Sequence, residues 1–216
     1  MCTKSLPIFF CFLGLAGCQT IEPVRYTGLT SSSSLKPNAG SNARRMPYSY
    51  KADVDWAAYT SAIVEPVTIY RGPDHQFGKL LEADRKTLAG YMQTRFRESL
   101  GRKFRLTDRA APNTLRIKPV LTGATTNTPV LSTFSRFDVA GAVYNGVQSA
   151  RGGEGSFTGA VMYAVEIYDA STDRLLHAFV AKQYPNAYDI SASTGALAAA
   201  KAGIDKGAEE LLTQLR

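Results

Sequence analysis

The chain has 216 residues, of which 44% are hydrophobic and 20% charged, and its formal net charge is +7. This length suits one domain with a tail, and the apolar content is enough for one hydrophobic core. The positive charge indicates attraction to anionic surfaces, but nucleic acid is not expected as a partner because the chain begins with an export signal.

That signal occupies the first residues. A stub with one charge, Lys4, precedes a short apolar run that ends in Leu15-Ala16-Gly17-Cys18. A charged stub, an apolar segment and a small-residue cleavage site predict a secretory signal peptide over residues 1–17. The tetrapeptide resembles the lipobox of bacterial lipoproteins, which implies cleavage between Gly17 and Cys18 and acylation of the Cys18 thiol, with palmitate among the acyl chains. The alternative is an ordinary cysteine behind an uncleaved apolar segment.

The cysteine count agrees with this interpretation. Cys2 and Cys11 would leave with the signal, and Cys18 would be acylated, so the mature chain would have no free thiol and no disulfide. No later apolar run approaches the ~20 residues that span a bilayer, so acylated Cys18 would be the membrane attachment. Gln19 stands where many Gram-negative lipoproteins of the inner membrane have aspartate. This favours the outer membrane, with the domain facing the periplasm.

Residues 18–52 have the composition of a lipid-anchored tether. They are rich in Ser, Pro, Gly, Asn and Arg, and such a segment buries too little apolar surface to offset its ordering entropy. Three apolar side chains could nevertheless pin parts of it to the domain: Tyr26, Leu29 and Leu35. A periplasmic domain is expected over residues 53–216.

The first predicted elements of this domain are a strand and a helix. Residues 61–70 are nearly continuously apolar, as in a strand covered on both faces. Pro66 removes one backbone donor, which requires an edge position or a bulge there. Residues 81–100 are predicted to be helical because apolar side chains repeat every four residues: Leu88, Met92, Phe96 and Leu100.

Three further strands and a second helix follow. Residues 114–122 alternate between apolar and polar, which indicates a strand with one wet face. Residues 157–169 and 174–184 read as a hairpin, and residues 196–215 as a helix. The order β-α-β-β-β-α predicts an α+β fold, with a mostly antiparallel sheet of about four strands and two main helices packed on it.

A long region over residues 125–155 has no clear periodicity. Its centre is apolar but made largely of small residues. It is either a short helix covering the sheet and followed by a turn, or a surface for a partner, since long loops in compact domains often carry function. The partner surface would consist of Val139, Val143, Tyr144 and Val147.

Catalytic and metal-binding motifs are scarce. His75 and His177 lack the spacing of a metal site, there is no nucleophile elbow, and no cofactor or metal is expected. Glu65 and Glu166 lie in apolar strands, where burial could raise a carboxyl pKa and suit acid/base chemistry. Alternatively, these carboxylates face solvent or pair with Arg116 or Lys118 across the sheet.

The densest basic stretch lies at the end of the first predicted helix. Positive charge there is favourable to the helix dipole, which is a sufficient explanation by itself. If the side chains also form a patch, it would contact an anionic partner through Arg95, Arg102, Lys103 and Arg105.

Several short motifs occur along the chain in a characteristic order. They are Tyr26-Thr27-Gly28-Leu29, Leu35-Lys36-Pro37, Asp55-Trp56-Ala57-Ala58-Tyr59, Glu65-Pro66-Val67, Leu115-Arg116-Ile117, Pro129-Val130-Leu131 and Glu166-Ile167-Tyr168-Asp169-Ala170. In this order they resemble bacterial lipoproteins of the family numbered 3313 among the domains of unknown function. The resemblance covers most of the mature chain, although Leu29 stands where the family favours an aromatic residue. It implies an exported, lipid-anchored α+β domain, docking of residues 26–37 on that domain, and no transferable catalytic residues.

These observations predict a non-enzymatic lipoprotein whose periplasmic domain binds an envelope protein or another copy of itself. The alternative is an envelope enzyme that uses Glu65 and Glu166, which requires both carboxylates to line one cleft.

Overall fold

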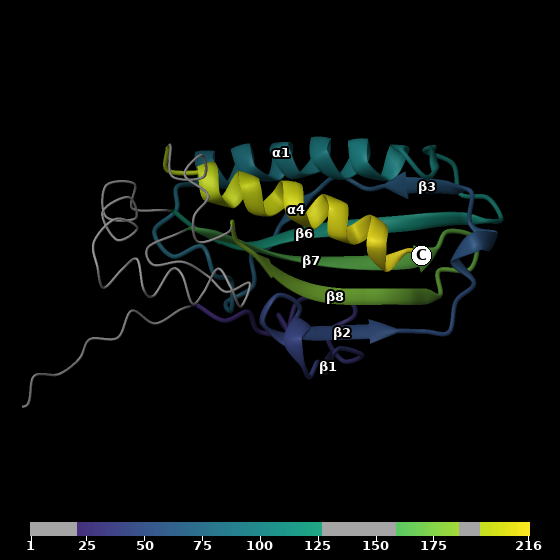
Figure 1. Ribbon diagram of the computed structural model, residues 1–216, viewed down its shortest axis with the longest axis horizontal. Coiled ribbons are helices and arrows are strands. Elements are labelled where there is room, and N and C mark those ends of the chain that lie inside the picture. The colour runs from purple at the N-terminus through teal and green to yellow at the C-terminus, as the bar shows by residue number, and fades with distance from the viewer. Residues whose placement is uncertain (1–20, 127–158, 186–194) are drawn as a thin grey trace, which may run out of the picture.

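A computed structural model describes residues 21–126, 159–185 and 195–216. It has an α+β fold, as predicted, in which two helices pack on a mixed, mostly antiparallel sheet (Figure 1). The elements are β1 (Lys36–Pro37), η1 (Ser41–Arg44), β2 (Tyr48–Lys51), η2 (Trp56–Ala58), β3 (Ser61–Val64), β4 (Thr68–Ile69), α1 (Glu82–Gly101), β5 (Arg105–Leu106), β6 (Thr114–Thr125), β7 (Ala160–Asp169), β8 (Leu175–Gln183) and α4 (Ala198–Gln214).

The sheet has eight strands rather than about four. Its order is β1-β2-β8-β7-β6-β3-β5, and β4 also pairs with β6. Three strand pairs are parallel, namely β3–β5, β3–β6 and β4–β6, and the other pairs are antiparallel. The predicted order β-α-β-β-β-α omits β1, β2 and β5, because strands of two to four residues are too short to produce a readable alternation.

The single strand predicted over residues 61–70, with an edge position or a bulge at Pro66, is in fact two short strands with a break around Pro66, which has no backbone donor. Strand β3 ends at Val64 and β4 begins at Thr68, and both pair with β6. Helix α1 stabilises this break, because the side-chain oxygen of Gln93 accepts a hydrogen bond from the Val67 backbone N–H at 2.7 Å.

One face of the sheet is covered by α1 and α4, which run along the strands (Figure 1). The predicted stripe of α1 is buried, from Leu88 to Leu100, and packs into the main core with Tyr163 and Ile167 of β7. Polar contacts join the two helices: the Tyr91 hydroxyl donates to Asp205 at 2.9 Å, and the Ser99 hydroxyl donates to the Ala208 carbonyl at 2.8 Å.

The other face of the sheet is covered by the segment that precedes the expected domain. Tyr26, Leu29 and Leu35 are buried against Ala164, Ala178 and Val180. Strand β2 pairs with β8 over Tyr48–Lys51. The docking that the family resemblance implies is therefore present. The prediction of a tether over residues 18–52 is corrected, since residues 26–51 belong to the fold. Three buried apolar side chains and two short strands hold this segment in place despite its polar composition.

Candidate functional site

The N-terminal segment is held by a buried tyrosine. Tyr26 is fully buried, and its hydroxyl donates to Gln76 Oε1 at 2.5 Å. Its ring meets Tyr70 edge-on, with ring centroids 5.3 Å apart. Burial raises the pKa of Tyr26 well above its ordinary value. Its φ of 52° lies in the left-handed region that bulky residues rarely adopt, so these contacts must hold the backbone in place.

A second group of hydrogen bonds joins the segment to the turn after β4. The Tyr70 hydroxyl accepts from the Gly28 backbone at 2.9 Å and donates to Asp74 Oδ1 at 2.6 Å. The other oxygen of Asp74 accepts from the Thr27 backbone at 2.8 Å. Although burial opposes it, the bonds from Tyr70 and Thr27 lower the pKa of Asp74 below its ordinary value. The segment and the turn are therefore fixed to each other.

Glu166 also helps to hold the N-terminal segment on the sheet. Its side chain is buried, and Oε1 accepts a hydrogen bond from the Ser31 backbone at 2.6 Å. Burial and the neighbouring Glu166 carboxylate raise the pKa of Tyr168 to about 12. Glu166 thus lies beneath the N-terminal segment.

Glu65 has a different environment. It pairs with Arg116 at 3.3 Å, the ion pair across the sheet that the sequence offers as the alternative to catalysis, and Arg116 also pairs with Asp173 at 2.5 Å. Glu65 is half-buried at the end of β3, whereas Glu166 is covered. The two carboxylates therefore lie on either side of β6, with separate partners and no shared opening among the described residues.

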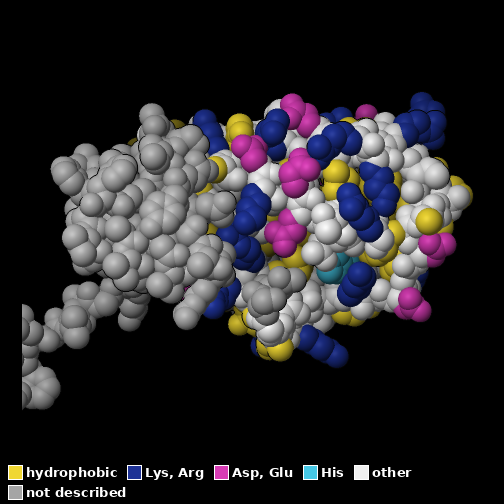
Figure 2. All heavy atoms as spheres, viewed as in Figure 1, with side chains coloured by type: hydrophobic (Ala, Val, Ile, Leu, Met, Phe, Trp, Pro, Cys, Tyr) yellow, Lys and Arg dark blue, Asp and Glu magenta, His cyan; other side chains and the backbone are white. Residues whose placement is uncertain are grey.

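The basic residues at the end of α1 are engaged within the molecule. Arg95 pairs with Glu98 at 2.5 Å and with Asp205 at 2.6 Å. Arg102 pairs with Glu209 of α4 at 2.5 Å. Lys103 donates to the Leu215 carbonyl, and Arg105 lies 3.4 Å from the Ser61 hydroxyl. Figure 2 shows acidic and basic side chains interspersed over this face, rather than a single cationic patch.

The remaining predicted site residues lie outside the described ranges. These are the cleavage and acylation residues Gly17 and Cys18 and the partner surface of Val139, Val143, Tyr144 and Val147. Within residues 21–126, 159–185 and 195–216, no cluster of three potential metal ligands occurs. In the same ranges, no helix has the length and apolarity needed to cross a bilayer.

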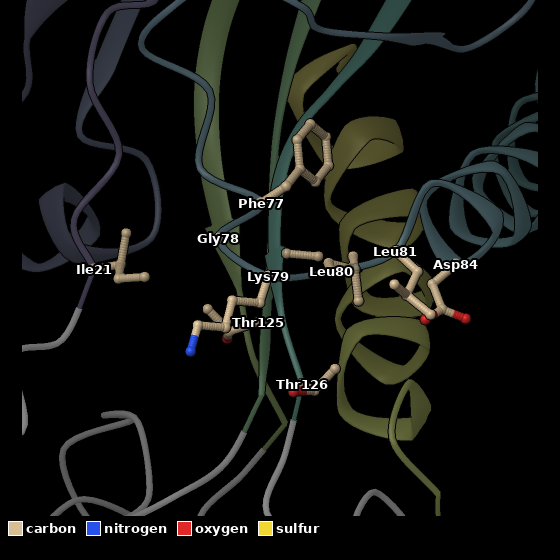
Figure 3. Close-up of a pocket in the computed structure, with 10 residues that line it drawn as sticks. Ile21, Phe77, Gly78, Lys79, Leu80, Leu81, Asp84, Thr125 and Thr126 are labelled. Carbon is tan, nitrogen blue, oxygen red and sulfur yellow. The ribbon is translucent and has the colours of Figure 1, made fainter.

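A pocket that the sequence did not indicate opens near residue 21, where the described chain begins (Figure 3). Its volume is about 270 Å³. It lies between the loop that leads into α1 and the end of β6, and neither Glu65 nor Glu166 lines it. The signal that could have located it is the apolar set Phe77, Leu80 and Leu81 directly before the helix. The lining residues are Ile21, Phe77, Gly78, Lys79, Leu80, Leu81, Asp84, Ala124, Thr125 and Thr126.

The pocket has a mixed but mainly apolar character. Phe77 and Leu80 are buried in its wall, whereas Leu81 is 68% exposed and Ile21 39% exposed. One cation, Lys79, and one anion, Asp84, also line it. The described lining contains no histidine, serine or cysteine that could act as a base or nucleophile there. The arrangement suits contact with an apolar group more than acid/base chemistry.

Comparison with known proteins yields a family and two similar structures. A family model described as "Protein of unknown function (DUF3313)" matches residues 25–211. No curated protein matches the chain. A dodecamer of a PelC point variant from Paraburkholderia phytofirmans is 10% identical, with a TM-score of 0.40, covering 76% of this chain and 93% of that one. A PelC dodecamer from the same organism is 12% identical, with a TM-score of 0.39, covering 74% and 94%.

Proposed function

The chain belongs to the DUF3313 family, and we propose that it is a lipid-anchored lipoprotein of the outer membrane, whose periplasmic domain is a non-enzymatic binding or assembly module. The lipobox ending at Cys18 supplies the anchor in this proposal. A triacylated cysteine carries three acyl chains, which is more than the two that stable anchoring needs.

The observation that carries the proposal is the attachment of the chain directly after the lipobox. The Glu22 carbonyl accepts a hydrogen bond from Gln76 Nε2 at 2.8 Å, and Tyr26 is buried. Only Gln19, Thr20 and Ile21 therefore separate Cys18 from the first residue bonded to the domain. An acylated Cys18 would hold the domain against the membrane, where it can act on envelope partners.

The carboxylate alternative is not favoured by any observation. An enzyme using Glu65 and Glu166 needs both groups at one opening, but Glu65 is paired with Arg116 and Glu166 accepts from Ser31 beneath the N-terminal segment. The binding-module proposal accounts for both as structural groups.

The anchor is tested by mass spectrometry of the mature protein from membranes. We expect a chain that begins at Cys18 and carries acyl groups, and we expect Cys18→Ser to move the protein to the soluble fraction. Separation of inner and outer membranes then tests the location. A mature chain that keeps residues 1–17 without acylation would contradict the proposal.

The partner is tested by cross-linked capture from envelopes. The wild type is compared with a variant in which residues 139–147 are replaced by a polar linker. We expect an envelope protein, or a second copy of the chain, to be captured only with the native segment. Capture that is equal in both forms would remove residues 139–147 from the proposed binding surface.

A further inference from the structure

Few large hydrophobic side chains are exposed among the described residues. They are Ile21, Val24 and Leu81, with exposed fractions of 39%, 37% and 68%. Ile21 and Leu81 line the same pocket, although they come from distant parts of the chain, and Val24 follows Ile21 by three residues. Single exposed apolar residues are ordinary, but two that line one pocket, with a third that follows three residues along the chain, are typical of a contact surface.

The position of this surface limits what can cover it. Ile21 is the third residue after Cys18, so their Cα atoms lie at most about 11 Å apart even in a fully extended chain. The chain cannot extend this reach, because the Glu22 carbonyl is bonded to Gln76 and Pro23 is buried. Any bilayer that holds the acyl chains of Cys18 must therefore lie close to Ile21.

We propose that this end of the molecule rests on the phospholipid surface, with Ile21, Val24 and Leu81 inserted at its interface. The inference depends on the proposed acylation of Cys18, and it adds which face meets the membrane and through which side chains. Lys79 lines the same pocket and is suited to the headgroup level, because a lysine can bury its alkyl stem while its amine stays in water. Asp84 lies in the first turn of α1, where a carboxylate is favourable to the helix dipole.

This contact defines the orientation of the domain. The pocket includes Ala124 and Thr125 at the end of β6, and the 12 residues of β6 extend over roughly 35–40 Å. The opposite end of β6, with the exposed Ala110 in the connection before it, therefore projects away from the bilayer. A probe at each end distinguishes this orientation from one in which the opposite end of β6 meets the bilayer.

The test uses the acylated protein in vesicles of phosphatidylethanolamine and phosphatidylglycerol. With Cys18 acylated and Cys2 and Cys11 removed with the signal, an introduced cysteine is the only free thiol. An environment-sensitive fluorophore is attached to Leu81→Cys, to Lys79→Cys as a second position that preserves Leu81, and to Ala110→Cys as the distant control. We expect blue-shifted emission and quenching by doxyl-labelled lipid at positions 79 and 81, and neither change at position 110.

The outcomes separate the two proposals. Failure of the protein to float with vesicles would contradict the lipid anchor itself. Flotation with the same aqueous emission at positions 79, 81 and 110 would leave the anchor in place and overturn the membrane-contact surface. Blue-shifted emission at position 81 without quenching by doxyl lipid would also overturn it, because protein, such as a second copy, would then cover the site.

Discussion

Glu166 lies in the middle of β7. The sequence leaves three roles open for its carboxylate: acid/base chemistry, an ion pair across the sheet, or exposure to solvent. In the structure it has another role: it is 3% exposed and accepts the Ser31 backbone at 2.6 Å. The partner comes from a segment 135 residues away in the chain. Local sequence patterns do not encode such a pairing, which is why this role could not be predicted.

Removing this carboxylate should weaken the attachment of the N-terminal segment. Glu166→Ala leaves the buried Ser31 N–H without its acceptor, so we expect a loss of about 1–3 kcal/mol in the free energy of unfolding, measured by urea denaturation. Glu65→Ala is the control, because its half-buried pair with Arg116 should be worth about 0–1 kcal/mol. Equal losses in the two variants would refute the role assigned to Glu166.

His177 is a second buried polar residue with a structural role. It is 2% exposed, and its Nδ1 lies 2.5 Å from the Tyr50 carbonyl, which accepts the ring proton. Nε2 is buried and has no partner among the described residues. Burial, with a smaller contribution from the nearby Lys51 charge, lowers the pKa of His177 below its ordinary value, although the Tyr50 bond opposes the shift. The folded protein therefore keeps the ring neutral.

This depressed pKa predicts a loss of stability in acid. The unfolded chain binds a proton at His177 below about pH 6.5, whereas the folded chain does not. The free energy of unfolding should therefore fall as the pH drops below 6.5 towards the folded-state pKa of His177, by up to about 1.4 kcal/mol per pH unit. Above about pH 6.5 the contribution of His177 should be constant. Denaturant unfolding between pH 5 and 8 measures the slope. His177→Gln should reduce it, and His75→Gln, at an exposed site, should retain it.

At the scale of elements, periodic segments were predictable and short ones were not. The stripe from Leu88 to Leu100 and the alternation in β6 identified α1 and β6 close to their observed bounds. The hairpin turn after β7 was also predicted, and Asp169 closes it by accepting from the Ser171 and Thr172 backbones at 2.9 Å. Strands β1 and β2 were missed, because they are short, β2 pairs with the distant edge of β8, and β1 in turn pairs with β2.

Helix α4 lies so close to the sheet that its Gly203 should not tolerate a larger side chain, whereas Gly90 of α1 should. A Cβ on Gly203 would lie 2.8 Å from the Gln183 carbonyl oxygen, which is backbone and cannot turn away. Gly203→Ala should therefore lose about 1–3 kcal/mol of stability, despite a better helix propensity. Gly90→Ala in α1 meets nothing within 4 Å and should gain about 0.5–1 kcal/mol. Thermal unfolding of both variants measures the difference, and a stabilised Gly203→Ala protein would contradict the packing argument.

At the scale of the whole molecule, the sheet is enclosed between two helices and a segment that composition alone assigns to a tether. On the side opposite α1 and α4, Ala164 of β7 and Ala178 and Val180 of β8 are buried against Tyr26, Leu29 and Leu35 of this segment. Composition predicted a tether there because it measures only average apolarity, whereas the individual side chains Tyr26, Leu29 and Leu35 indicated points of attachment, and all three are buried. The family resemblance, which implies docking of residues 26–37, agrees with these anchors, but neither predicts the pairing of β2 with β8.

The boundary of the folding unit can therefore be tested by truncation. A chain that begins at Asp53, the expected domain start, lacks β1, β2 and the cover over Ala164, Ala178 and Val180. It leaves the β8 edge unpaired and the Glu166 carboxylate without its Ser31 donor, so we expect aggregation or loss of cooperative unfolding. A chain that begins at Ile21 retains the whole cover and should unfold in one transition. Circular dichroism and size-exclusion chromatography compare the two, and a stable monomer from residue 53 would show that the N-terminal segment is only an accessory to the fold.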